Sequence, residues 1–104
     1  MKQIKVLQIK HDNTKETHYR RFSSLRMLKE MGMPFNPSYY EVVFDGQMDV
    51  KDAEDVYTLC NIGQKPNGYK GHSLSVSDIV LIDGKYMFCD SFGFKDITDM
   101  WTNR

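Results

Sequence analysis

The chain has 104 residues, of which 40% are hydrophobic and 12% aromatic. That is enough for the packed core of one domain over residues 1–104, and too many for a disordered tail. Lys and Arg number 14, as do Asp and Glu, so the formal net charge is zero. This balance argues against a wholly basic nucleic-acid binder and against a wholly acidic decoy.

No segment of the sequence is typical of export or of membrane insertion. The longest apolar runs have four residues, as in 79–82, and no secretory signal precedes the first alternating segment. Without an export signal, Cys60 and Cys89 are expected to be reduced, buried thiols. We therefore expect a cytoplasmic protein that does not enter a membrane.

The first half of the chain predicts two strands separated by a helix. Residues 3–10 nearly alternate apolar and polar side chains and are rich in β-branched residues, which indicates a strand. Between about residues 19 and 31, apolar residues recur every three positions and predict a helix that ends at Gly32. Residues 39–45 predict a second strand, which ends at an Asp-Gly turn.

The acidic segment that follows predicts a short helix over residues 53–61. Asp52 is a good N-cap, and Val56, Leu59 and Cys60 are expected to face inward. The next residues hold three glycines and a proline, so a loop is expected over 62–72.

The clearest local signal is the Asp83-Gly84 pair between two β-rich runs. Asp-Gly favours a type I′ turn, because both central positions of that turn need positive φ. One face of the resulting hairpin carries only large apolar side chains and is expected to be the core side. Its members are Ile79, Leu81, Tyr86 and Phe88.

The end of the chain completes the predicted fold. Gly93, between two phenylalanines, predicts a tight bend, and Ile97 and Trp101 are candidates for a closing segment that packs on the sheet. The fold class predicted from these elements is α+β: an antiparallel sheet of four to five strands with two helices in a single domain.

The zero net charge hides a division along the chain. Residues 1–33 hold eight basic and three acidic residues, a net charge of +5, whereas residues 41–55 hold six acidic residues and one Lys, a net charge of −5. Such asymmetry hints at an interaction surface, although an ordinary solvated face gives the same pattern. The candidate contacts with a partner are Asp45, Asp49, Asp52, Glu54 and Asp55.

Basic and aromatic residues on the predicted first helix leave a nucleic-acid interface open as an alternative. The candidate contacts are Arg20, Arg21, Arg26 and Lys29. Phe22 lies in phase with Leu25 and Leu28, which favours a core position for that ring.

The sequence lacks the spacings of common metal and cofactor sites. The three histidines fall in no zinc-binding pattern, and the loop glycines match neither the Walker loop nor the dinucleotide fingerprint, so we expect no metal or cofactor. Cys89, His72 and Asp90 could form a catalytic triad, with Cys89 as nucleophile, His72 as general base and Asp90 as the residue that orients the histidine. Neighbouring strand residues point to opposite faces, which argues against that arrangement, and we expect a protein that is not an enzyme.

Residues 71–80 read Gly-His-Ser-Leu-Ser-Val-Ser-Asp-Ile-Val, and residues 90–94 read Asp-Ser-Phe-Gly-Phe. By themselves, the alternating serines predict a solvent-facing strand edge, and Ser77 with Asp78 is expected to cap the turn into the next strand. Over residues 39–98 the chain resembles the YodL-like domain, a family of plasmids and integrative conjugative elements. The resemblance implies an origin in a mobile genetic element and supplies no catalytic residue.

Small proteins of such elements often disable host defences, and the chain is similar in size and appearance to an anti-CRISPR protein that acts on a type II effector. The resemblance therefore implies a non-enzymatic inhibitor, a monomer or weak dimer, that binds a Cas9-type nuclease. Such effectors hold nucleic acid in positively charged channels, against which the acidic segment could dock. The alternative is a nucleic-acid-binding accessory protein of conjugation or plasmid maintenance.

Overall fold

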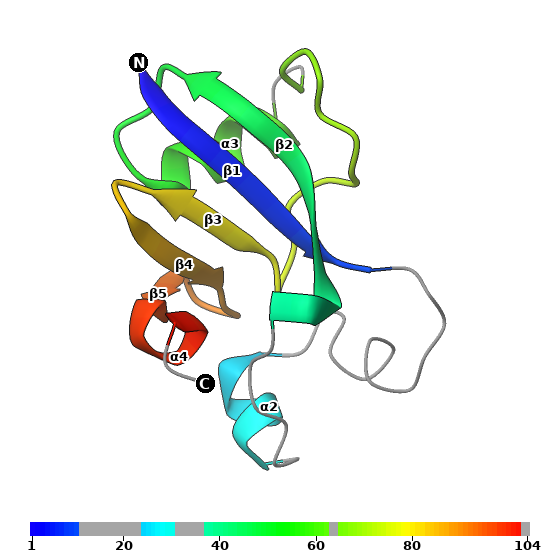
Figure 1. Ribbon diagram of the computed structural model, residues 1–104, viewed down its shortest axis with the longest axis vertical. Helices are drawn as coiled ribbons and strands as arrows, with labels where there is room; N and C mark the ends of the chain where they lie inside the picture. Colours follow the sequence, from blue (N-terminus) through cyan, green and yellow to red (C-terminus); the bar gives the residue numbers. More distant parts are fainter. Residues whose placement is uncertain (11–23, 31–36, 63–64, 103–104) are drawn as a thin grey trace.

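A computed structural model describes residues 1–10, 24–30, 37–62 and 65–102 of the chain (Figure 1). In this part of the chain the strands are β1 (Lys2–Ile9), β2 (Tyr40–Met48), β3 (Ile79–Ile82), β4 (Lys85–Cys89) and β5 (Phe94–Asp96). The helices are α2 (Leu25–Glu30), α3 (Ala53–Asn61) and α4 (Thr98–Thr102), and a 3-10 turn, η1 (Pro37–Tyr39), precedes β2.

The five described strands form one antiparallel sheet in the order β2-β1-β3-β4-β5. This confirms the α+β class and the upper end of the predicted strand number. Among the described residues, α4 is a helix beyond the two that the sequence predicts, and it forms the closing segment. Ile97 and Trp101 are buried there, as predicted.

Strand β1 is an inner strand of the sheet, and it pairs with strands from two distant parts of the sequence. Val6 pairs with Phe44 of β2 on one side and with Val80 of β3 on the other. An extra residue of β2, Val43, lies opposite the step from Val6 to Leu7 and forms a β-bulge. The Val43 carbonyl accepts a hydrogen bond from the Lys70 N–H (2.8 Å), which ties the long loop before β3 to β2.

Strand β2 continues past the Asp45-Gly46 pair, so the predicted turn at this place is wrong. Gly46 pairs with Ile4 of β1, and the strand ends only at Met48. A Cβ atom on Gly46 would lie 2.9 Å from Cζ of the Phe44 ring. The glycine therefore leaves room for that ring, and the pairing with β1 outweighs the local preference of Asp-Gly for a turn.

The β3–β4 hairpin has the predicted turn and register. Asp83 and Gly84 have φ angles of 53° and 76°, as a type I′ turn requires. Ile82 pairs with Lys85, as predicted. The expectation of one core face is incomplete, because Val80 is also fully buried on the opposite face.

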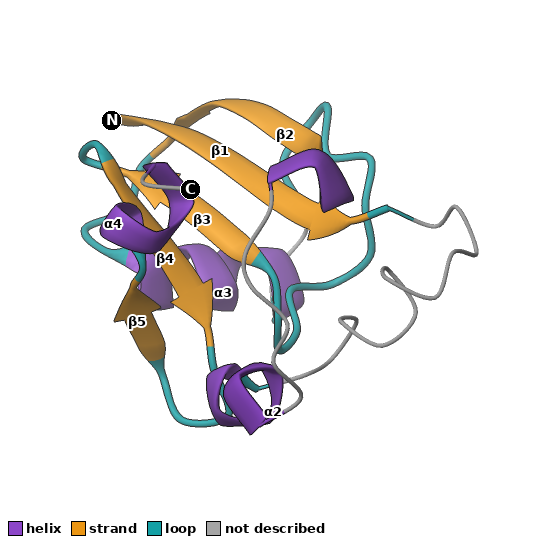
Figure 2. Ribbon diagram, turned by 60° about the horizontal axis from the view of Figure 1, so that its bottom comes forward, coloured by secondary structure: helices purple, strands orange, loops and turns teal. Residues whose placement is uncertain are grey.

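The sheet is buried on both faces because helices cover both. Figure 2 shows α3 on one side of the sheet and α4 on the other. On the α3 side, Val56 and Cys60 belong to one core cluster with Val80, and on the other side Trp101 belongs to a second cluster with Phe88. Strands between two helical layers carry apolar residues on both faces, which explains the continuous apolar run of β3.

Candidate functional site

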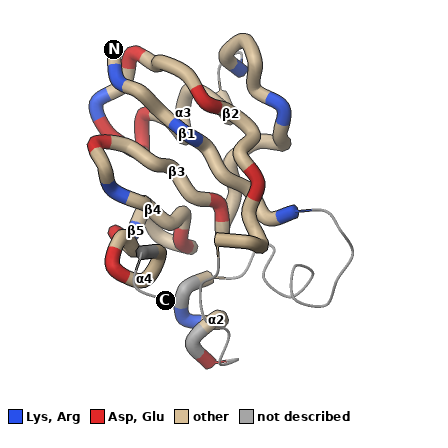
Figure 3. Tube along the Cα trace, in the orientation of Figure 1, with Lys and Arg blue, Asp and Glu red and all other residues tan. Residues whose placement is uncertain are grey.

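Five carboxylates that the sequence indicates as partner contacts lie on β2, on the loop after it and on the first turn of α3 (Figure 3). We call this set the acidic edge: Asp45, Asp49, Asp52, Glu54 and Asp55. Asp45 projects from β2, an outer strand of the sheet, and accepts a hydrogen bond from Gln3 Nε2 (2.7 Å). Asp49 and Glu54 are exposed.

Two members of the acidic edge also stabilise α3. Asp52 is the N-cap, as predicted, and its carboxylate accepts a hydrogen bond from the Asp55 N–H (2.9 Å). The Asp55 carboxylate in turn accepts one from the Lys51 N–H (2.9 Å). Both carboxylates are held at the positive end of the helix dipole, which favours their charge. The helix itself is confirmed, but Leu59 is 36% exposed rather than turned inward.

The acidic edge has no cation of its own among the described residues. The ion pairs in that part of the chain are Lys2–Asp83 (2.8 Å) and Arg26–Glu30 (3.1 Å), and neither includes a member of the edge. Lys2 Nζ also donates to the Lys51 carbonyl oxygen (2.9 Å), so the nearby ammonium group is already engaged. Among the described residues, the partners of the edge carboxylates are therefore neutral hydrogen-bond donors: Gln3, the Lys51 N–H and the Asp55 N–H.

The basic residues proposed as an alternative interface are only partly within the described residues. Arg20 and Arg21 lie outside them, and of Lys29 only the backbone is described. Arg26 lies on α2, where its Nε donates to Glu30 Oε1 one helical turn away (3.1 Å). Leu28 is buried against the sheet, as predicted.

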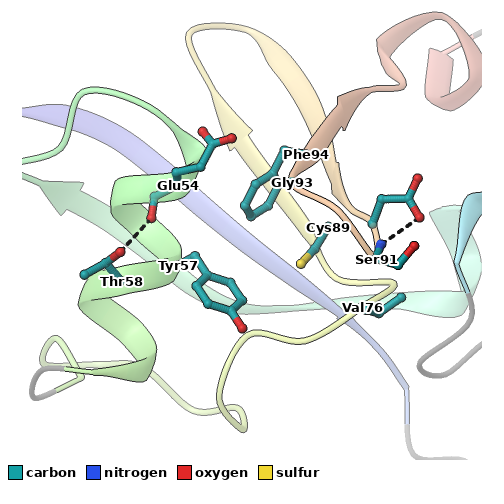
Figure 4. Close-up of a pocket in the computed structure, with 9 residues that line it drawn as sticks. Glu54, Tyr57, Thr58, Val76, Cys89, Ser91, Gly93 and Phe94 are labelled. Carbon is teal, nitrogen blue, oxygen red and sulfur yellow. Dashed lines mark hydrogen bonds between the residues drawn. The ribbon is translucent and has the colours of Figure 1, made fainter.

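A cleft of about 360 Å³ opens between α3 and the turn that joins β4 to β5 (Figure 4). Tyr57 projects from α3 toward the strands, and the Phe94 ring lies on the opposite wall with its centroid 6.5 Å from that of Tyr57. Glu54 and Asp90 line the cleft as well, and Cys89 contributes its sulfur atom. The cleft thus joins an aromatic pair to two carboxylates.

Cys89 has the environment of an inert thiol. Burial, together with the charges of Asp78 and Asp90, raises the pKa of Cys89 to about 12, so the thiol is protonated at neutral pH. His72 Nδ1 lies 2.6 Å from the Ser73 carbonyl oxygen, the partner expected of an Nδ1–H group. Nucleophilic cysteines need neighbours that lower the thiol pKa, and here the neighbours raise it. Cys60 is likewise buried, and burial raises its pKa to about 11.

A buried polar cluster joins β1 to the loop before β3, and sequence reasoning missed it. The Gln8 side chain donates from Nε2 to Asp78 Oδ2 (3.0 Å) and to the His72 carbonyl oxygen (2.9 Å), and its Oε1 accepts from the His72 N–H (3.2 Å). Asp78 Oδ2 also accepts from the Ser75 N–H (2.9 Å). The Tyr69 hydroxyl donates to the same His72 carbonyl (2.8 Å).

Burial raises the pKa of Asp78 to about 7, although the hydrogen bonds from Ser75 and Gln8 and the nearby His72 lower it. Asp78 is only 2% exposed, as is Gln8. A glutamine among the apolar residues of β1 was the available signal, because a buried amide needs partners from elsewhere in the fold. This cluster fastens the loop to the sheet.

The serine-rich segment before β3 is not the solvent-facing strand edge that its alternation predicts. Ser77 is buried and has a φ of 87°, which breaks the strand geometry, and its N–H donates to the Cys89 carbonyl oxygen (2.9 Å). The Asn61 side chain binds both backbone groups of Leu74 (2.7 Å each). The predicted cap is confirmed at Asp78, whose carboxylate accepts a hydrogen bond from the Ser75 N–H. The segment is therefore a structural turn.

Comparison with known proteins places the chain in a family. The YodL-like domain matches residues 3–100. The chain belongs to the YodL-like domain family. The YodL-like match begins in β1 and ends in α4, so the predicted extent of 39–98 was too short. No curated protein and no solved structure is significantly similar to the chain.

The described part of this YodL-like domain shows two further features relevant to its site. None of its helices is long and apolar enough to cross a membrane. Within the same residues, no three His, Cys, Asp or Glu side chains converge as the ligands of a metal ion do. Its arrangement presents carboxylates at the acidic edge and two aromatic rings in the cleft.

Proposed function

We propose that this YodL-like domain is a non-enzymatic protein of a mobile genetic element that binds and inhibits a host defence effector, a type II RNA-guided nuclease. In this proposal the acidic edge occupies a basic surface of the effector. The observation that carries the proposal is that, among the described residues, no Lys or Arg side chain forms an ion pair with the five carboxylates of the edge.

The acidic edge suits a basic surface because its carboxylates are held in place. Asp52 and Asp55 accept backbone hydrogen bonds at the start of α3, and Asp45 accepts one from Gln3. Groups that are already ordered lose less entropy on binding than free side chains do. RNA-guided nucleases hold nucleic acid in positively charged channels, so fixed carboxylates would compete there with phosphates.

Inhibition without catalysis agrees with the chemistry of the described residues. The cysteine that lines the cleft is protonated at neutral pH, and its charged neighbours are carboxylates. Contact between an acidic surface and a basic surface needs no reacting group. We therefore expect inhibition to be stoichiometric, with one effector blocked for each inhibitor bound.

The proposal is tested by cleavage of target DNA by a purified type II nuclease loaded with its guide RNA. Wild-type protein is expected to block cleavage at near-equimolar amounts, and the Asp45→Lys/Asp49→Lys variant is expected to lose the block. Asp52 and Asp55 stay unchanged, because they cap α3. A variant that inhibits as well as the wild type would contradict the proposal.

The matched control is the Glu41→Lys/Asp99→Lys variant, which changes the net charge by the same amount. Glu41 and Asp99 are exposed, and Glu41 lies at the opposite end of β2 from Asp49, about 26 Å away at the usual rise of a strand. This variant is expected to inhibit as the wild type does. Equal loss in both variants would mean that only net charge matters.

The nucleic-acid alternative is tested with the same protein and a labelled oligonucleotide. Binding that weakens steeply with added salt would favour it, because phosphate contacts release counterions. In the described residues, Arg26 forms an exposed ion pair with Glu30, and a bound phosphate would have to displace that partner.

A further inference from the structure

The cleft between α3 and the β4–β5 turn has the size of a site for one side chain. Its volume of about 360 Å³ lies near the lower end of ligand pockets, which span roughly 300–1,000 Å³. Tyr57, which lines the cleft, is 40% exposed, so solvent reaches part of the lining. A side chain presented by another protein can therefore enter it.

Two aromatic rings form the walls of the cleft. The planes of Tyr57 and Phe94 meet at 78°, with the ring centroids 6.5 Å apart. Figure 4 shows the two rings and, on the side of the strands, the Cys89 side chain. A cation that enters this corner can lie over the face of one ring, where the ring quadrupole attracts it.

The charged groups that line the cleft are both carboxylates. Glu54 is exposed, and its Oε1 lies 3.8 Å from the position that a Cβ on Gly93 would take, so the carboxylate reaches toward the β4–β5 turn. Asp90 lines the same space, with Oδ1 accepting the Ser91 N–H (2.9 Å). Among the described residues, no Lys or Arg lines the cleft.

We propose that the cleft binds an arginine side chain of the protein partner, with the guanidinium group against the Tyr57 and Phe94 rings and paired with the Glu54 carboxylate. Arginine fits better than lysine because its planar guanidinium stacks on aromatic rings and donates two parallel hydrogen bonds to one carboxylate. The inference rests on the proposed function, since it names the group that a basic partner contributes.

The test is an NMR titration of the ¹⁵N-labelled full chain with N-acetyl-arginine amide, compared with the citrulline analogue, which has the same shape without the charge. We expect the arginine probe to shift amide signals of residues 54–58 and 89–94 and to bind about tenfold more tightly than citrulline. Equal binding of the two probes, shifts along 45–52 instead of the cleft, or no shifts would each overturn the inference.

Variants separate the two contacts that the inference assigns. Glu54→Gln is expected to weaken arginine binding about fivefold and Tyr57→Leu about threefold. The matched control is Asp99→Asn, which also removes one charge from the first turn of a helix and should bind as the wild type does. If Glu54→Gln binds as tightly as the control, the inference is wrong.

The titration does not involve a nuclease, so its failure is distinguishable from failure of the proposed function. A protein that inhibits the nuclease through Asp45 and Asp49 but binds no arginine probe contradicts only the cleft. A protein that binds the probe in the cleft and inhibits no nuclease contradicts only the choice of partner.

Discussion

Carboxylates occupy two regions of this protein under opposite conditions. At the acidic edge they are at the surface and, among the described residues, without a cation. In the buried cluster, Asp78 is 2% exposed and its Oδ2 accepts hydrogen bonds from Gln8 and Ser75. The same chemical group is thus solvated at the surface in one region and enclosed in a hydrogen-bonded cluster in the other, where burial disfavours its charged form. The difference between the two regions is the burial of the carboxylate, which the residue type alone does not predict.

The pH dependence of stability should separate the two regions most strongly. The pKa of Asp78 rises from 3.8 to about 7 on folding, so the folded state binds this proton more tightly than the unfolded state. Its contribution to the free energy of unfolding is then lost as pH rises from about 4 to about 7. Asp78→Asn mimics the neutral carboxyl group and should lack this loss.

Relative to the wild type, Asp78→Asn should therefore gain stability between pH 4 and pH 8, by up to about 4 kcal/mol. Urea denaturation at a series of pH values measures this difference, and Asp49→Asn controls for the loss of one surface charge. A difference that shrinks as pH rises would contradict the assignment of Asp78 as a carboxyl group whose pKa is raised by burial.

Removing the amide at the centre of the buried cluster should have the next largest effect. Gln8→Leu takes the hydrogen-bond donor from Asp78 and both backbone contacts from His72. Buried polar groups without partners are expensive, so the free energy of unfolding should fall by about 3 kcal/mol at pH 8. A loss below about 1 kcal/mol in urea denaturation would show that the cluster does not hold the loop.

The close approach of the loop to β1 can be tested at a glycine. A Cβ atom on Gly71 would collide with Gln8 Oε1 and lie 2.9 Å from Val43 Cβ. Gly71→Ala should therefore lower the unfolding free energy by about 2 kcal/mol. Gly68→Ala is the control, because Gly68 has a φ of 88° with no atom near its Cβ position, and should cost about 1 kcal/mol. The reverse order, measured by thermal unfolding, would contradict the contact.

The acidic edge should show the smallest effect on stability. Asp45→Lys/Asp49→Lys changes two exposed side chains, so the unfolding free energy should stay within about 0.5 kcal/mol of the wild type. Circular dichroism during urea unfolding measures this. A fall of several kcal/mol in the unfolding free energy would mean that Asp45 and Asp49 stabilise the fold. The distinction between the two regions would then be wrong.

Sequence reasoning succeeds where a local signal and the tertiary fold agree. The Asp83-Gly84 turn fixes the hairpin register because positive φ is needed at both positions, and the structure has it. Asp52 predicts the start of α3 because a side-chain cap acts within one helical turn. The clustering of acidic residues over 41–55 is visible in the sequence, but their role as partner contacts stays a prediction.

Sequence reasoning fails where a distant contact overrides the local signal. Gly46 lies within β2 because it pairs with Ile4 of β1, and the absence of a side chain leaves room for the Phe44 ring. Ser77 has a positive φ, which breaks the strand geometry. Asp78 accepts a hydrogen bond from Gln8 of β1, which lies 70 residues earlier in the sequence. The aromatic cleft depends on Tyr57 and Phe94 meeting across 37 positions of sequence, which no spacing rule predicts.

The central claim is that a partner recognises the acidic edge through Asp45 and Asp49, two exposed carboxylates that are not needed for the stability of the fold. Its most direct test is the affinity of the Asp45→Lys/Asp49→Lys variant for a guide-loaded type II nuclease, measured by isothermal titration calorimetry. The account predicts binding at least about tenfold weaker than that of the wild type and of the Glu41→Lys/Asp99→Lys control. Equal affinity of all three folded proteins would contradict it.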